Sequence, residues 1–165
     1  MIIRPERPTD TMAIRTVVTA AFRDASRSDG NEADIVDALR IDGTLAVSLV
    51  AEDDAGLVGH VAFSPVAVNS EEVGWFGLGP VAVLTAKRRR GVGAALIEAG
   101  LKRLDELGAR GCVVLGDPAY YRRFGFESDC ELRFADVPSE YFQRLVIDGE
   151  PPRGLVNYSS AFYGR

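Results

Sequence analysis

The stretch Arg88-Arg89-Arg90-Gly91-Val92-Gly93 decides how this sequence is interpreted, because it follows a strand-like run and leads directly into an amphipathic helix. Gly91 and Gly93 let backbone N–H groups approach a ligand with no Cβ in the way. The positive end of the helix dipole and the arginine side chains favour an anion at the same place. The stretch therefore predicts a site for a phosphorylated cofactor.

The composition sets the broad class of protein. The chain has 165 residues, of which 47% are hydrophobic, and a formal net charge of −5. One domain, residues 1–165, can bury a sizeable core at this length without disulfides or a structural metal. The acidic balance argues against a dedicated nucleic-acid-binding protein, in which lysine and arginine would be in excess and clustered.

Two further observations bear on location and partners. Cys112 and Cys130 have neither the spacing of a metal site nor that of a disulfide framework. No apolar run approaches the ~20 residues of a membrane-spanning helix, and the N-terminus lacks the pattern of a signal peptide. We therefore expect a cytoplasmic protein with no metal, no nucleic-acid partner and no membrane partner.

Apolar periodicity and turn residues predict mixed helices and strands. A first strand at Ile2-Ile3 precedes a helix that Thr9 or Asp10 can cap. In chain order, the other expected elements are a helix over 32–40, strands over 45–51, 57–68 and 73–84, a helix after the glycine loop that ends at Gly108, a strand over 112–115, a short helix over 119–124, a strand over 126–134, a turn or helix over 138–145 and a strand over 156–163. The apolar faces of the two longer helices are expected to comprise Met12, Ile14, Val17, Val18, Ala21 and Phe22 in the first, and Ala95, Leu96, Ile97, Ala99, Leu101, Leu104 and Leu107 in the second.

The predicted strand over 73–84 is chemically unusual. It contains Gly74, Gly77 and Gly79, and Pro80 cannot donate to a ladder. A bulge is expected here, and bulges free backbone groups beside active sites; a plain edge strand with a proline is the alternative. The following helix and strand complete a βαβ unit, so the two flanking strands should be parallel.

Two motifs resemble one family. The loop lacks the Gly-Lys-Ser/Thr ending of a P-loop and the three glycines of a dinucleotide fingerprint. Residues 83–93 instead resemble the acetyl-CoA-binding motif of the GNAT family of N-acetyltransferases, and Tyr120-Tyr121-Arg122-Arg123-Phe124-Gly125-Phe126 resembles its later motif of an aromatic pair, three residues and Gly-Phe. Residues 115–121 and 158–162 further resemble a bacterial subgroup of N-acetyltransferases with unassigned substrates.

The resemblance implies an α/β fold with a mixed, mostly antiparallel sheet, in which a parallel pair of strands splays around the pantetheine arm of acetyl-CoA. The residues that it assigns to binding of acetyl-CoA or a related acyl-CoA are Val81, Ala82, Val83, Arg88, Arg89, Arg90, Gly91, Val92, Gly93 and Ala94. Thr85 and Lys87 stand where the family often has proline and an aromatic residue. Neither departure removes a main-chain donor.

The implied reaction is direct transfer of an acetyl group to a primary amine of a small molecule or peptide, with Tyr121 as the general acid. A packing role is the alternative for Tyr121. The general base stays open; the candidates are Glu32, His60, Glu71, Glu72, Asp117 or a water. The acceptor pocket is expected to draw on residues 22–39 and the C-terminal strand, and a homodimer is compatible with the family.

Other functions receive less support from the residues. A non-catalytic acyl-CoA-binding module would keep the arginine loop and need no acid at Tyr121. A cysteine nucleophile, Cys112 or Cys130 acting with His60, is disfavoured. Cys112 lies in a predicted buried strand, and buried structural cysteines are usually unreactive. The aromatic and basic residues could imitate an RNA surface, which the acidic balance opposes.

Overall fold

The computed structural model describes residues 1–26 and 28–164. Its helices and strands, in chain order, are β1 (Ile2–Pro5), α1 (Thr11–Phe22), α2 (Glu32–Asp42), β2 (Val47–Asp53), β3 (Gly56–Val68), β4 (Glu71–Val83), α3 (Val92–Glu106), β5 (Gly111–Leu115), α4 (Pro118–Tyr121), β6 (Glu127–Ser128), β7 (Leu132–Arg133), β8 (Phe142–Val146) and β9 (Gly154–Asn157). Short 3-10 turns lie at Pro8–Asp10, Thr85–Lys87, Arg122–Phe124, Ser139–Tyr141 and Ser160–Tyr163.

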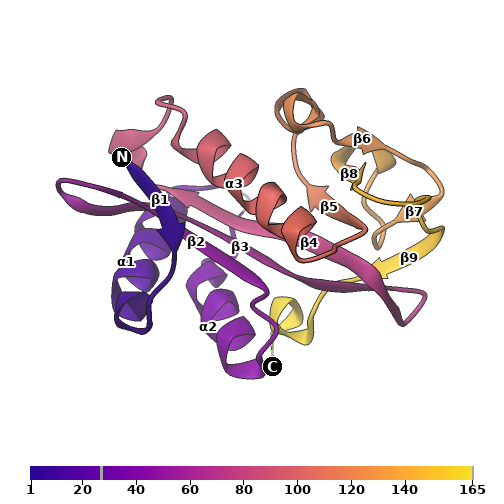
Figure 1. Cartoon of the computed structure of the whole chain (residues 1–165), viewed down its shortest axis with the longest axis horizontal. Helices are drawn as coiled ribbons and strands as arrows, with labels where there is room; N and C mark the ends of the chain where they lie inside the picture. The colour runs from indigo at the N-terminus through magenta and orange to yellow at the C-terminus, as the bar shows by residue number, and fades with distance from the viewer. Residues whose placement is uncertain (27, 165) are drawn as a thin grey trace.

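The strands form a mixed sheet in the order β1-β2-β3-β4-β5-β8-β6, and β9 pairs with the end of β3 and with β7. Strands β2, β3 and β4 form an antiparallel meander, as the turn residues between them predict, and β1 pairs antiparallel with β2 at the edge of the sheet. The predicted βαβ unit is confirmed, because β4 and β5 are parallel and α3 connects them. Helix α3 covers one face of the sheet, whereas α1 and α2 cover the other (Figure 1).

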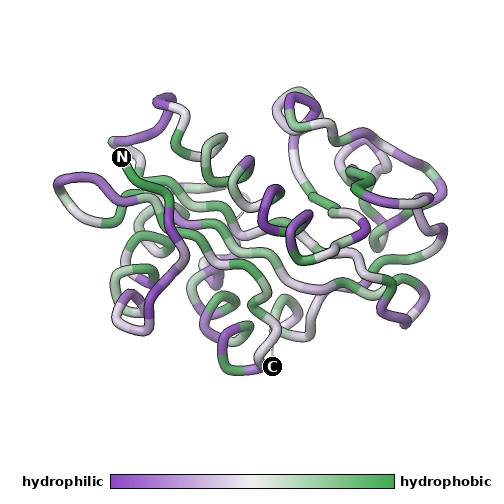
Figure 2. The backbone as a smooth tube through the Cα atoms, viewed as in Figure 1, coloured by the Kyte–Doolittle hydropathy of each residue, from purple (hydrophilic) through white to green (hydrophobic). Residues whose placement is uncertain are grey.

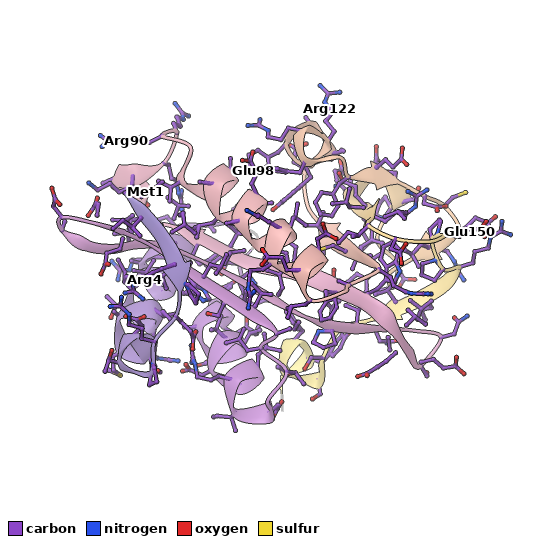
Figure 3. The ribbon with its side chains drawn as sticks, in the orientation of Figure 1. Met1, Arg4, Arg90, Glu98, Arg122 and Glu150 are labelled. Carbon is purple, nitrogen blue, oxygen red and sulfur yellow. The ribbon has the colours of Figure 1, made fainter. Side chains whose placement is uncertain are left out.

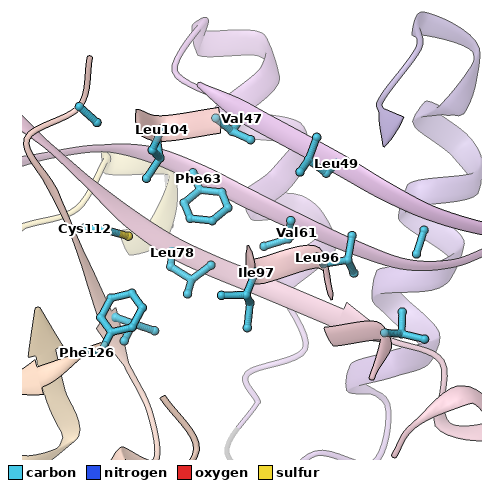
Figure 4. Close-up of a cluster of buried hydrophobic side chains, with 14 of the residues drawn as sticks. Val47, Leu49, Val61, Phe63, Leu78, Leu96, Ile97, Leu104, Cys112 and Phe126 are labelled. Carbon is cyan, nitrogen blue, oxygen red and sulfur yellow. The ribbon is translucent and has the colours of Figure 1, made fainter. Parts of the chain in front are cut away.

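The main core lies between α3 and the strands beneath it. Leu96, Ile97 and Leu104 of α3 pack with Phe63 and other apolar side chains of the sheet (Figure 4). Gly100 leaves room for the Phe63 ring, which would overlap any Cβ at that position. Hydrophobic residues follow the central strands, and hydrophilic residues concentrate in the connecting loops (Figure 2). Burial of these apolar side chains fixes the position of α3 against β4.

Strand β4 diverges from β5 after a short parallel stretch. The pairing covers Trp75 to Gly77 of β4 only, and the register with β3 shifts between Leu78 and Val81. In this interval β4 has one residue more than β3, so the predicted bulge at Gly79 and Pro80 is confirmed. The alternative of an edge strand is wrong, because β4 lies between β3 and β5.

Several local predictions were wrong. The strand expected over 126–134 is reduced to β6 and β7, and the last strand ends at Asn157 before a 3-10 turn. In the segment 138–145 the expected turn is present at Ser139–Tyr141, but strand β8 follows it. Met12, in the first turn of α1, and Leu107, the residue after α3, are exposed rather than buried. Asp10 precedes α1 but does not cap it with its side chain, because its carboxylate accepts from Arg4 and from the Arg7 backbone.

Candidate functional site

A cavity of about 480 Å³ lies where β4 leaves β5, and we refer to it as the loop cavity. Its walls come from the end of α1, the end of β4, the β4–α3 loop, the first turn of α3 and the α4 region. The lining residues are Ala21, Phe22, Ala25, Val81, Val83, Lys87, Arg88, Arg89, Gly91, Val92, Gly93, Ala94, Tyr120, Tyr121 and Arg123. The structure therefore brings together most of the residues predicted to bind the cofactor.

The first turn of α3 presents free backbone donors to this cavity. Gly91 precedes the helix with φ of +79°, and the first intrahelical bond runs from the Ala95 N–H to the Gly91 carbonyl. The amides of residues 92–94 come before that bond and have no partner within the helix. Arg89 also has a left-handed φ, of +65°, so two such residues turn the chain into α3. This geometry suits an anion at the positive end of the helix dipole.

The last residues of β4 offer main-chain groups on the side away from β3. The Leu84 N–H donates to the Val58 carbonyl, and Ala82 is opposite His60 in the ladder. Because main-chain groups alternate along a strand, those of Val81 and Val83 point toward the edge that β5 has left. Ala82 does not line the loop cavity, since its side chain is buried against α1.

The three arginines of the loop have different surroundings. Arg88 donates to the carbonyl of Ala21 at 2.6 Å and to that of Val83 at 3.3 Å, so its guanidinium ties the loop to α1 and β4. Arg89 lines the loop cavity. Arg90 projects from the tip of the loop, outside the cavity (Figure 3).

Charge in the loop cavity is of one sign. Lys87, Arg88, Arg89 and Arg123 line it, and within the described part of the chain no carboxylate does. Lys87 is 3.1 Å from an Asp53 oxygen, and the Arg123 guanidinium stacks over the Tyr120 ring at 4.4 Å. A multiply charged phosphate ligand would meet a positive potential here.

A second cavity, of about 520 Å³, adjoins the first, and we refer to it as the aromatic cavity. Its lining residues are Phe22, Asp29, Asn31, Glu32, Ile35, Leu78, Gly79, Pro80, Val81, Leu115, Tyr121, Phe134, Tyr158, Phe162 and Tyr163. It thus lies between residues 22–39 and the C-terminal segment, the two regions expected to form an acceptor pocket. Phe22, Val81 and Tyr121 line both cavities.

Tyr121 occupies the junction between the two cavities. Burial raises the pKa of its phenol to about 12, so the hydroxyl carries its proton at neutral pH. The hydroxyl makes no hydrogen bond to any residue that the structure describes, which leaves it available to a ligand. A protonated phenol between two cavities can donate a proton to a leaving group.

The position of the Tyr121 ring depends on Gly116, at the end of β5. A Cβ at Gly116 would lie 2.5 Å from Cε2 of Tyr121, so only glycine permits this ring position. The Gly116 carbonyl accepts a hydrogen bond from Nε2 of Gln143, a buried side chain of β8, at 3.1 Å. Gln143 and Gly116 were not among the predicted site residues. The Gly116 contact could have been suspected from the adjacent aromatic motif, whereas no local signal marks Gln143.

The five candidate bases lie in different places. Glu32 lines the aromatic cavity and accepts from the Ser28 hydroxyl at 2.7 Å. Glu71 and Glu72 are exposed at the start of β4, at the opposite end of the strand from the residues that line the loop cavity. Asp117 caps α4. His60 is buried in β3, beside Ser48, and burial lowers its pKa to about 4. Of the five, Glu32 alone lines either cavity.

A cysteine nucleophile has no support in the geometry. Cys112 is buried and burial raises the pKa of its thiol, while Cys130 is exposed and lines neither cavity. The Nε2 atom of His60 contacts the Ser48 hydroxyl at 2.8 Å instead of a thiol.

In residues 1–26 and 28–164, no group of three or more His, Cys, Asp or Glu is arranged to hold a metal ion. Across the same residues, no helix has the length and apolar character needed to cross a membrane.

Comparison with known proteins agrees with this geometry. The family model described as an acetyltransferase (GNAT) domain matches residues 45–128. The Escherichia coli (strain K12) protein called uncharacterized N-acetyltransferase YhbS is 41% identical over 169 residues, which cover 98% of each chain. A GNAT family acetyltransferase from Brucella melitensis, solved with acetyl-CoA, has a TM-score of 0.88 at 49% identity, over 98% of this chain and 97% of that one. YhbS solved with CoA has a TM-score of 0.86 at 38% identity, over 98% and 91% of the two chains. The fold, the two motifs and these full-length matches together establish that the chain belongs to the GNAT family of N-acetyltransferases.

Proposed function

We propose that this protein transfers an acetyl group from acetyl-CoA to a primary amine, with Tyr121 as the general acid. The observation that carries the proposal is that Tyr121 lines both cavities, so one phenol can reach a donor in the loop cavity and an acceptor in the aromatic cavity. The Brucella melitensis relative was solved with acetyl-CoA and YhbS with CoA, which supports the same donor here.

The residues of the loop cavity fit the donor. The unpaired amides of residues 92–94 and the Arg89 side chain would hold the pyrophosphate. The outward main-chain groups of Val81 and Val83 would hydrogen-bond the pantetheine arm, whose amides need such partners. Arg88 is already bonded to Ala21 and Val83, so we assign it to ordering the loop rather than to direct binding.

The bound donor would supply a thioester, whose carbonyl carbon is attacked by the amine and whose sulfur leaves. Attack forms a C–N bond and the C–S bond breaks, so the nitrogen loses a proton and the sulfur gains one. Tyr121 would donate the proton that the sulfur gains, and its raised pKa keeps that proton in place at neutral pH. Holding amine and thioester in adjoining cavities would replace a bimolecular encounter.

Glu32 would receive the proton that the amine loses, directly or through water. An alkylamine has a reference pKa of about 10.4 and is mostly protonated at neutral pH, so a base must act before attack. Of the bases expected from the sequence, Glu32 is the one that lines the aromatic cavity, which Asp29 also lines, and its Ser28 hydrogen bond holds it in place. Replacing Glu32 with Gln should lower kcat/KM at pH 7 and have a smaller effect at pH 9.5, where more of the amine is neutral. Equal losses at both pH values would remove Glu32 from this role.

Ligand-dependent stability and thiol release test the proposed function. Acetyl-CoA and CoA at 100 times their Kd should each stabilise the protein by about 2.7 kcal/mol, whereas NAD and ATP at the same concentrations should not. Thiol release from acetyl-CoA should then require an added amine. The absence of a shift with either CoA ligand would reject the donor, and a shift without turnover on any amine would favour a non-catalytic acyl-CoA-binding module.

A further inference from the structure

The aromatic cavity has a continuous wall of three rings from two parts of the chain, one from residue 134 and two from the C-terminal segment. The centroids of Phe134 and Tyr158 are 5.0 Å apart in an edge-to-face arrangement, and those of Tyr158 and Phe162 are 5.1 Å apart. A Cβ at Gly77 would lie 2.5 Å from the Tyr158 ring, so the middle ring packs directly on β4. These contacts make the wall a preformed surface.

Much of the remaining lining of the cavity is also apolar. Phe22 of α1, Ile35 of α2 and residues 78–81 of the β4 bulge line it, and Phe162 packs against the cluster that contains Ile35. Polar groups enter mainly from the segment that leads into α2, where Asp29, Asn31 and Glu32 line the cavity. Tyr121, with its phenol at the junction, marks the end at which transfer would take place.

We infer that the acceptor is a small primary amine whose nitrogen is carried on an apolar body about the size of one ring. This inference rests on the proposed function and specifies its substrate class. Aromatic faces attract both apolar groups and an ammonium ion, and the carboxylate of Glu32 adds to the attraction for a cation. The cavity volume of about 520 Å³ is typical of small-molecule sites.

The same wall disfavours hydrophilic acceptors. A sugar or polyamine body would place several hydroxyl or amino groups against Phe134, Phe162 and Ile35, which offer them no hydrogen bond. Each polar group that loses water without gaining a partner weakens binding. An apolar body gains free energy from the same burial. Apolar amines should therefore have a lower KM and a higher kcat/KM than hydrophilic ones.

An amine panel tests the inference. Thiol release from acetyl-CoA would be compared for 2-phenylethylamine, 2-cyclohexylethylamine, ethylamine, putrescine and glucosamine. We expect kcat/KM for the two ring-bearing amines to exceed those for putrescine and glucosamine by roughly tenfold or more. Equal or higher kcat/KM for putrescine or glucosamine would overturn the inference and leave the proposed function intact.

Substitutions test whether the aromatic wall causes the preference for ring-bearing amines. Phe162→Ala should raise the KM for 2-phenylethylamine roughly tenfold and change that for ethylamine much less, because ethylamine is too short to contact the ring. Tyr141→Ala removes an exposed aromatic ring that lines neither cavity, and it should change neither value. Equal effects of the two variants, or equal effects of Phe162→Ala on both amines, would overturn the inference. Phe162→Leu provides a milder change if the alanine variant does not fold.

A binding measurement separates this inference from the proposed function. With CoA bound, 2-phenylethylamine should raise the thermal midpoint of the wild type more than that of Phe162→Ala, and CoA alone should stabilise both equally. This comparison needs no turnover, so it decides the acceptor class even if every amine of the panel fails to react. An equal shift in the two proteins, or none in the wild type, would overturn the inference.

Discussion

The Nε2 atom of Gln143 donates a hydrogen bond to the Gly116 carbonyl at 3.1 Å, and Gly116 is the residue against which the Tyr121 ring packs. The bond links the buried strand β8 to the end of β5 just before α4. It therefore holds the peptide that sets the position of the proposed acid, although Gln143 itself lines neither cavity. Gln143 is a positioning residue for Tyr121.

Disturbing this link should lower turnover and spare donor binding. Gly116→Ala would push the Tyr121 ring out of its position, and a misplacement of about 1 Å can lower a rate roughly 100-fold. Gln143→Leu should have a smaller effect of the same kind. The measurement is kcat together with the Kd for CoA; a parallel rise in Kd would indicate that the substitutions damage the loop cavity in general.

The different environments of the loop arginines predict different consequences of removing them. Arg88→Gln deletes the hydrogen bonds to Ala21 and Val83, so it should lower the free energy of unfolding by about 1 kcal/mol. Arg90→Gln removes the same charge from the tip of the loop and should stay within about 0.5 kcal/mol of the wild type. Urea unfolding of the free proteins measures both. Equal stabilities of the two variants would contradict the tethering role of Arg88.

Gly91, which precedes α3, and Gly93, in its first turn, offer a matched pair of substitutions. Gly91 has φ of +79°, so Gly91→Ala should destabilise the free protein by about 1 kcal/mol and weaken CoA binding, because the first turn of α3 shifts. Gly93 is inside the helix, and a Cβ there would make ordinary contacts at 3.5 Å and 3.6 Å. Gly93→Ala should therefore preserve stability. Thermal unfolding of the two variants without ligand checks this prediction. A Gly93→Ala variant less stable than Gly91→Ala would contradict the left-handed backbone conformation of Gly91.

Because His60 is buried, we expect the folded protein to lose stability in acid. Burial lowers its pKa to about 4, whereas the unfolded chain has a pKa of about 6.5. Between these values the unfolded chain binds a proton that the folded protein does not, so stability falls as pH falls from 6.5 and the loss is complete below 4. The effect amounts to about 3 kcal/mol.

The control for this prediction is His60→Gln, which removes the titrating group from the buried position. Its free energy of unfolding should depend less on pH between 6.5 and 4 than that of the wild type, because only carboxylates then titrate. Identical pH dependence of the two proteins, measured by urea unfolding at several pH values, would show that His60 does not titrate as its burial implies.

Sequence alone predicted the parts of this fold that depend on local patterns. The meander, the α3 helix and the bulge at Gly79 and Pro80 follow from periodicity, glycine and proline. The region after Phe126 was predicted poorly, because β6 and β7 are two-residue strands whose pairing partners are distant in sequence. Tertiary contacts decide such strands rather than local propensity.

In the candidate site, too, sequence predicted the features that depend on local patterns and missed those that depend on tertiary contacts. The motif placed residues 88–94 at the start of a helix, where the structure has them. Sequence could not show that Arg88 is bonded to Ala21, 67 residues earlier in the chain, or that Ala82 faces α1. Those facts depend on how α1 packs on the sheet. The aromatic cavity likewise joins segments from both ends of the chain.

Tyr121→Phe tests the role of Tyr121 most directly, measured by the kcat for thiol release and by the Kd for CoA. The phenylalanine ring keeps the packing against Gly116 and removes only the hydroxyl. We expect kcat to fall roughly 100-fold or more while the Kd stays within about threefold of the wild type. We also expect wild-type kcat to show no loss from Tyr121 ionisation below about pH 10, since the pKa of this phenol is raised to about 12. Unchanged kcat, or equal losses in kcat and CoA affinity, would contradict the central claim that Tyr121 protonates the leaving sulfur.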